Sequence, residues 1–149
     1  MSFARSLAAG LTGALTLNAL NEAAHRLTAP DAAVPRLDRL GTAALSRALG
    51  LGVRPARQAD EGGAVYGAAL ALDVAVNTVT YATVAGSKRP VLRGAATGAL
   101  SGAVALAAAA LLDRGQDVAR RPATPALTVL WYSVGGAAAG LAARALGER

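Results

Sequence analysis

Cysteine is absent from this chain of 149 residues. Its absence excludes a disulfide scaffold, a CxxC redox site, a cysteine-based zinc site and a cysteine nucleophile. Charge is also scarce: 16% of the residues are charged, against about 25% in an average globular chain. Disordered chains combine low hydrophobicity with high charge, whereas 54% of this chain is hydrophobic. The composition therefore excludes disorder.

Aromatic residues are few, with one Trp, three Tyr and one Phe, although the formal net charge is +6. Nucleic-acid binding needs a basic stripe and usually aromatic side chains that stack on bases. Here the basic residues are scattered between apolar runs, which argues against a nucleic acid and favours anionic lipid headgroups as partner. Lys88 is the only lysine and isoleucine is missing; this usage of arginine and alanine suggests a GC-rich bacterial genome.

Four long apolar segments dominate what is present. A bilayer core requires about 20 predominantly apolar residues in helical form. We predict an all-α integral membrane four-helix bundle, a single domain over residues 1–149, with spans at about 4–26, 62–86, 91–112 and 123–144. A soluble bundle would need a polar outer stripe on every helix, and residues 94–112 offer none. The expected location is the bacterial plasma (inner) membrane, as a multi-pass protein.

A polar segment separates the first two spans and contains a pattern typical of an amphipathic helix at about 34–49. Leu37, Leu40 and Leu45 fall on one face of that helix, as expected of a helix lying at the membrane interface. A short helix packed over the end of the bundle is the alternative. The sequence leaves both open.

The sequence gives opposing signals on the orientation of the protein in the membrane and on cleavage of its N-terminus. An even number of spans places both termini on one side. The two connections on the other side hold nine Arg, against six Lys and Arg on the terminal side, so the positive-inside rule favours cytoplasmic connections; the compact basic turn from Lys88 to Arg93 opposes this. Arg5 and the apolar run behind it resemble a signal peptide, but polar residues within the run favour an uncleaved span.

Small residues recur at four-residue spacing on every span. Helices in membranes associate by close van der Waals approach, which faces of small residues permit. The expected packing glycines are Gly10, Gly63, Gly67, Gly94, Gly98, Gly102, Gly136 and Gly140. Three of them in register, Gly94, Gly98 and Gly102, form the most specific stripe. A homodimer interface is a second use for such a stripe.

Polar residues at membrane depth are costly and are candidates for function. At 100° per residue, those on the first two spans share narrow arcs, and counting along the helices puts Asp73 level with residues of the third and fourth spans. The resulting polar track comprises Asn18, Asn21, Glu22, His25, Tyr66, Asp73, Asn77, Ser101, Trp131 and Tyr132. Tyr81, near the far end of the second span, is expected to be an anchor at the interface.

Three hypotheses account for the track. In the first, Asp73 is hydrogen-bonded within the bundle, Glu22 pairs with His25, and the protein is a non-enzymatic protein that packs or associates in the bilayer. In the second, Asp73 is an ion or proton site of a small transporter or channel, reached through Glu22 and His25. In the third, Glu22-Ala-Ala-His25 contributes to a di-metal site, which normally needs two such motifs and two more Glu. No catalytic residue, metal ligand set or cofactor is assigned.

Asp73→Asn separates these hypotheses. A packing role predicts altered stability or oligomeric state, whereas a transport role predicts normal assembly with lost ion or proton flux in proteoliposomes. An enzyme would instead lose a bound metal on His25→Ala. If Asp73→Asn and Glu22→Gln both leave stability, assembly and flux unchanged, the polar track has no role.

Overall fold

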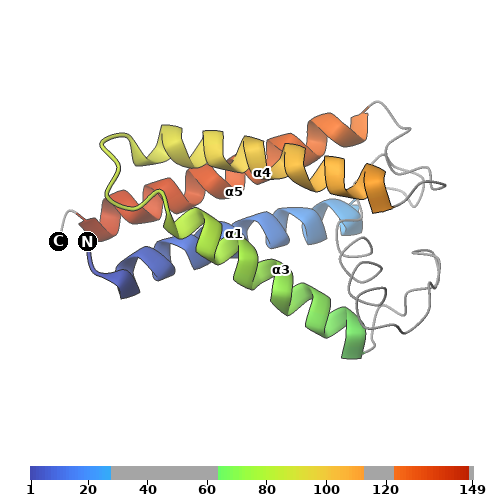
Figure 1. Ribbon diagram of the computed structural model, residues 1–149, viewed down its shortest axis with the longest axis horizontal. Helices are drawn as coiled ribbons and strands as arrows, with labels where there is room; N and C mark the ends of the chain where they lie inside the picture. The colour runs from blue at the N-terminus through green and yellow to red at the C-terminus, as the bar shows by residue number, and fades with distance from the viewer. Residues whose placement is uncertain (28–63, 113–122, 148–149) are drawn as a thin grey trace. The chain divides into compact units, whose positions relative to one another are not determined.

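The computed structural model describes residues 1–27, 64–112 and 123–147, and the regular secondary structure within them is all helical (Figure 1). The prediction of an all-α chain with four long helices is confirmed. The helices are α1 (Phe3–Leu27), α3 (Ala64–Ala82), α4 (Pro90–Leu112) and α5 (Ala123–Gly147). The amphipathic helix predicted at 34–49 lies outside the described residues.

The chain divides into two compact units, residues 1–35 with 74–149, and residues 36–73. The second unit is represented in the described part by the start of α3, residues 64–73. The first unit contains α1, the end of α3 from Val74, α4 and α5. The packing described below is that of the first unit.

A tight turn joins α3 to α4, and its residues explain where each helix stops and starts. The last turn of α3 narrows into i→i−3 hydrogen bonds, such as that from the Val84 N–H to the Tyr81 carbonyl (3.1 Å), which use carbonyls without an α-helical partner. Gly86 has φ of 81°, a conformation that glycine adopts without a steric penalty. The Arg89 N–H donates to Ser87 Oγ (3.3 Å), and Pro90 then starts α4, where its fixed φ suits a first helical position.

Helix α5 is the centre of the first unit, because α4 and α1 both pack along it (Figure 1). The α4–α5 contact is antiparallel: Gly94 faces Gly136, and one step of four residues along α4 puts Gly98 against Tyr132. A Cβ on Gly94 would overlap the Gly136 carbonyl, and a Cβ on Gly136 would overlap that of Gly94. The two backbones therefore touch directly, with a Cα hydrogen of each glycine directed at the carbonyl oxygen of the other.

Helix α1 packs on a second, neighbouring face of α5. A Cβ added to Gly13 would lie 2.6 Å from the Gly135 carbonyl oxygen and 2.7 Å from Ala139 Cβ. Gly135 and Gly136 are 100° apart around the helix axis, so one glycine serves each neighbour. Gly10 on α1 faces a third element, since its Cβ would overlap the Thr78 carbonyl of α3. Small residues thus let α5 approach two helices, and α1 approach α3.

Two of the four described helices are long and apolar enough to cross a membrane: α4 over Pro90–Ala108 and α5 over Pro125–Gly147. The prediction placed a span on each of the four helices. Helix α1 contains the polar residues Asn18, Asn21 and Glu22 in its second half, which lowers its hydropathy. By composition, the second pair of helices is therefore the stronger candidate for membrane crossing.

The glycine contact predicts that Gly98→Ala destabilises the protein by about 2 kcal/mol or more, in the range of overpacking penalties. The added methyl group meets the Tyr132 backbone, which can withdraw only if α4 and α5 separate. The measurement is reversible unfolding in mixed micelles, followed by circular dichroism.

Gly67→Ala is the matched control, because a Cβ at Gly67 has no atom within 4 Å among those described. Alanine has the higher helix propensity, so this variant should be neutral or more stable by up to about 1 kcal/mol. Equal unfolding free energies for the two variants would contradict the direct backbone contact at Gly98.

Candidate functional site

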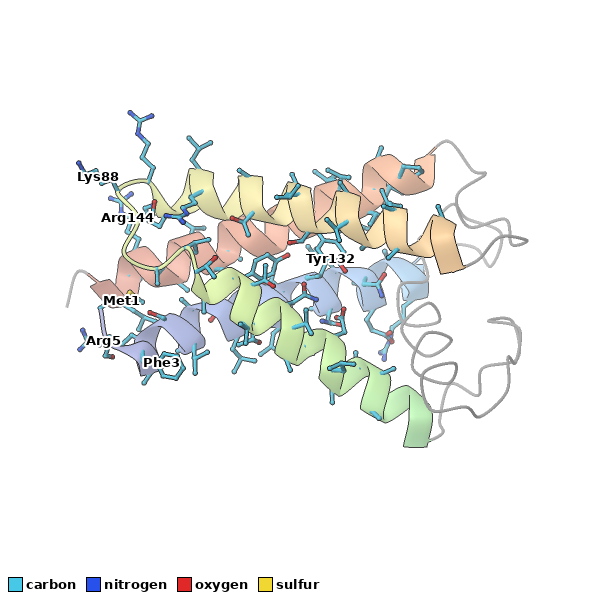
Figure 2. The ribbon with its side chains drawn as sticks, viewed as in Figure 1. Met1, Phe3, Arg5, Lys88, Tyr132 and Arg144 are labelled. Carbon is cyan, nitrogen blue, oxygen red and sulfur yellow. The ribbon has the colours of Figure 1, made fainter. Side chains whose placement is uncertain are left out.

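The Tyr132 carbonyl is the point where three helices of the first unit meet. The Tyr81 hydroxyl of α3 donates a hydrogen bond of 2.9 Å to this oxygen. Gly98 of α4 passes over the same oxygen so closely that a Cβ there would overlap it. Tyr132 belongs to α5 and its side chain is buried (Figure 2). One main-chain group therefore fixes the positions of α3 and α4 relative to α5.

The Tyr81 ring occupies a slot made by two glycines. A Cβ on Gly13 of α1 would come within 2.9 Å of Tyr81 Cδ2, and a Cβ on Gly135 of α5 would come within 3.3 Å of Tyr81 Oη. Tyr81 is fully buried and forms a core cluster with Val84 and Ala139. The expectation that Tyr81 anchors at the membrane interface is therefore wrong. A tyrosine can be buried when its hydroxyl has a partner, and that partner is the Tyr132 carbonyl.

Sequence reasoning did not single out Gly13 and Gly135, because it searched each helix for one stripe at four-residue spacing. The available signals were Gly13 at three residues after Gly10, and the adjacent pair Gly135 and Gly136. Adjacent glycines lie on two faces of a helix, which indicates two packing partners. Thr128, also fully buried on α5, was likewise missed.

The predicted packing glycines differ in their surroundings. Gly10, Gly94, Gly98, Gly102, Gly136 and Gly140 all lie against backbone or side-chain atoms of a neighbouring helix. No described atom lies within 4 Å of the place where a Cβ on Gly67 would stand, and Gly63 lies outside the described residues. The stripe on α4 faces α5 of the same chain, so it is already covered.

The polar residues of α1 make local contacts. Asn18 Nδ2 donates to the Ala14 carbonyl (3.0 Å) one turn earlier. Glu22 forms an exposed ion pair with Arg26, with 2.6 Å between Oε1 and Nε, where the first hypothesis expected His25; the His25 side chain is outside the description. Exposed pairs at this spacing contribute only about 0.3–0.5 kcal/mol. Glu22 thus lies exposed near the C-terminal end of α1.

The remaining predicted polar residues are spread over three helices. Ser101 Oγ donates to the Thr97 carbonyl of its own helix (2.9 Å), and Trp131 is half-buried. Asn77 is buried, whereas Asp73, four residues earlier on α3, is half-buried. The Tyr66 side chain lies outside the description. A continuous polar track from Glu22 to Asp73 stays a prediction.

Two buried polar atoms, Asn21 Oδ1 and Thr78 Oγ1, lack a hydrogen-bond partner among the described atoms. Buried polar groups are usually hydrogen-bonded, and an unmet one costs about 1–3 kcal/mol. In the described ranges no three His, Cys, Asp or Glu residues cluster as metal ligands do. The described contacts hold the helices together through backbone carbonyls.

The three-helix contact predicts that Tyr81→Phe destabilises the protein by about 1 kcal/mol, the usual net value of a hydrogen bond. The ring still fills its slot, so the loss reports the interactions of the Tyr81 hydroxyl, including the bond to the Tyr132 carbonyl. Unfolding in mixed micelles measures the difference.

Ser133→Ala is the control for this bond. The Ser133 hydroxyl donates to the Val129 carbonyl (2.7 Å) within α5, so its loss separates no helices. The change should stay within about 0.5 kcal/mol, because the substitution leaves the Ser133 backbone at the α4 contact unchanged. A Tyr81→Phe variant as stable as Ser133→Ala would refute the proposed link between α3 and α5.

Comparison of this chain with known protein families, curated proteins and solved structures finds no match. The function is therefore argued from the chain's own residues.

Proposed function

We propose that this chain is a multi-pass integral membrane protein whose helical bundle has a non-enzymatic, packing role in the bilayer. The observation that carries the proposal is the distribution of large and small apolar residues. Of the described leucines and valines only Leu17 and Val84 are buried, whereas glycine and alanine form most of the close contacts between helices.

The outer face of α4 gives the clearest support. Leu92, Leu100 and Val104 are 62%, 68% and 60% exposed. Only 17% of the apolar stretch Pro90–Ala108 is buried. A core helix of a soluble protein is mostly buried, whereas this helix exposes an apolar face free of charge from Gly94 to Leu112. Water would penalise such a face, and lipid tails would not.

The other helices repeat the pattern. Leu130 and Leu141 of α5, Val76 and Val79 of α3, and Leu15 of α1 are exposed. The residues buried in the described part are mainly alanine and glycine, with Tyr81, Val84 and Thr128 as the largest that are fully enclosed. A soluble bundle of this size gains its stability by burying leucines. Close contact between small residues is instead the main attraction available to helices in lipid.

The hydrogen bonds of the interior polar groups support the packing role. The Tyr81 hydroxyl joins α3 to a carbonyl of α5, and the Ser101 hydroxyl returns to its own helix. A homodimer remains part of the proposal, but it would use an outer face rather than Gly94, Gly98 and Gly102, because α5 covers that stripe. Anionic lipids are the other partner we propose.

Cysteine labelling tests the membrane assignment without background, because the chain has no native cysteine. Val104→Cys places a thiol on the outer face of α4, and Lys88→Cys places one in the exposed turn before α4. Maleimide reacts with the hydrated thiolate. In membranes opened by freeze–thaw, Val104→Cys should label at least about tenfold more slowly than Lys88→Cys, because a thiol in lipid stays neutral.

Both thiols should label at similar rates after the membranes are dissolved in denaturing detergent, which controls for the local sequence. Equally fast labelling in the freeze–thawed membranes before detergent is added would overturn the membrane assignment, since both side chains are exposed in the structure. Ion or proton flux that Asp73→Asn abolishes would replace the packing role by transport.

A further inference from the structure

An open hollow of about 750 Å³ lies at the end of the first unit where the α3–α4 turn is found. The start of α1, the turn and first residues of α4, and the last turn of α5 line it. The Arg5 guanidinium of α1 donates to the Leu146 carbonyl of α5 (3.4 Å), which holds the two helix ends together. The hollow is therefore formed entirely within one compact unit.

The charge of the hollow is of one sign. Arg5, Lys88, Arg89 and Arg144 line it, and no described acidic residue does. Figure 2 shows Arg5, Lys88 and Arg144 at the same end of the molecule. Glu22 and Asp73, the described acids, lie on α1 and α3 outside this lining; Glu148 follows α5 in the sequence. Basic residues gathered around one hollow produce a positive potential that attracts an anion. The hollow also contains Val91 and Leu92 of the first turn of α4, where main-chain N–H groups favour negative charge.

The rim of the hollow is apolar as well as basic. Met1 and Leu92 line it and are 49% and 62% exposed. Phe3, at the start of α1, is 79% exposed and lies at the same end of the molecule as Met1 and Arg5 (Figure 2). A soluble anion would contact the basic side chains alone and would leave the apolar side chains of the rim uncovered. A phospholipid offers a phosphate to the cations and acyl chains to the exposed apolar side chains.

We propose that this hollow binds the phosphate headgroup of an anionic phospholipid through Lys88, Arg89, Arg5 and Arg144. The proposal rests on the membrane assignment above, which brings the hollow to headgroup level: α4 and α5 carry no charge between the hollow and their far ends, from Gly94 to Leu112 and from Ala123 to Ala143. It goes further by naming the lipid class and the residues that recognise it.

The test is native mass spectrometry of the full chain in neutral detergent, titrated with phosphatidylglycerol or with phosphatidylcholine. Wild type should retain phosphatidylglycerol in preference to phosphatidylcholine. Lys88→Gln/Arg89→Gln should weaken phosphatidylglycerol binding on the order of 20-fold, because each basic residue near an anionic surface contributes about a fivefold gain. Both side chains are exposed, so the variant should fold normally.

Arg120→Gln/Arg121→Gln is the matched control, since it removes the same charge next to the opposite end of α5 in the sequence. It should bind phosphatidylglycerol as wild type does. Equal losses in both double variants, or equal retention of the two lipids, would overturn the site. Displacement of the lipid by millimolar inorganic phosphate would show that the hollow recognises a free anion instead.

Carbonate extraction of membranes carrying wild type and the Lys88→Gln/Arg89→Gln variant separates this proposal from the membrane assignment. Release of both by carbonate would refute membrane integration itself. Retention of both, with unchanged phosphatidylglycerol binding, would refute the headgroup site alone.

Discussion

The direct contact between the backbones of α4 and α5 is the constraint on which the rest of the described structure depends. Gly94 and Gly136 each stand where the other helix's carbonyl leaves room for a hydrogen and not for a methyl group. Because the contact repeats one helical turn later at Gly98 and Tyr132, it fixes both the distance and the register of the two helices. At Gly94 and Gly136 neither helix has a side chain between the two backbones.

That close approach determines where the larger residues go. Positions facing a neighbouring helix are mainly glycine, alanine and threonine, and of the described leucines and valines only Leu17 and Val84 are buried. In water this arrangement would forgo most of the hydrophobic stabilisation available to the chain. In a bilayer it forgoes nothing, since leucine against lipid is as favourable as leucine against leucine. The packing and the proposed location therefore have one physical cause.

Tyr81 shows how a polar group is used within such a bundle. Two glycines, Gly13 and Gly135, make space for its ring, and its hydroxyl reaches a main-chain carbonyl of α5. The bond joins helices that are far apart in the sequence. At the end of the same unit, the basic residues of the hollow lie at the edge of the apolar surface. Polar chemistry thus serves helix contact inside the bundle and, in our proposal, lipid recognition at its end.

The sequence by itself determined the four helices and the use of small residues. Apolar length and glycine spacing are local properties, and they are set by the chain whatever the helices pack against. Ser87 and Pro90 likewise indicated a tight turn between α3 and α4. The all-α class with four long helices and six of the packing glycines could be predicted for that reason.

Only the tertiary structure decided which faces meet. Periodicity shows that Gly135 and Gly136 lie on different faces of α5, but not that one serves α1 and the other α4. It put Tyr81 near the end of a span, where an interfacial anchor is expected, although pairing with glycines on two other helices buries it. The basic hollow combines residues from three parts of the chain. Such contacts depend on the register between helices, which is a property of the packed pair and is not encoded in the pattern of either helix alone.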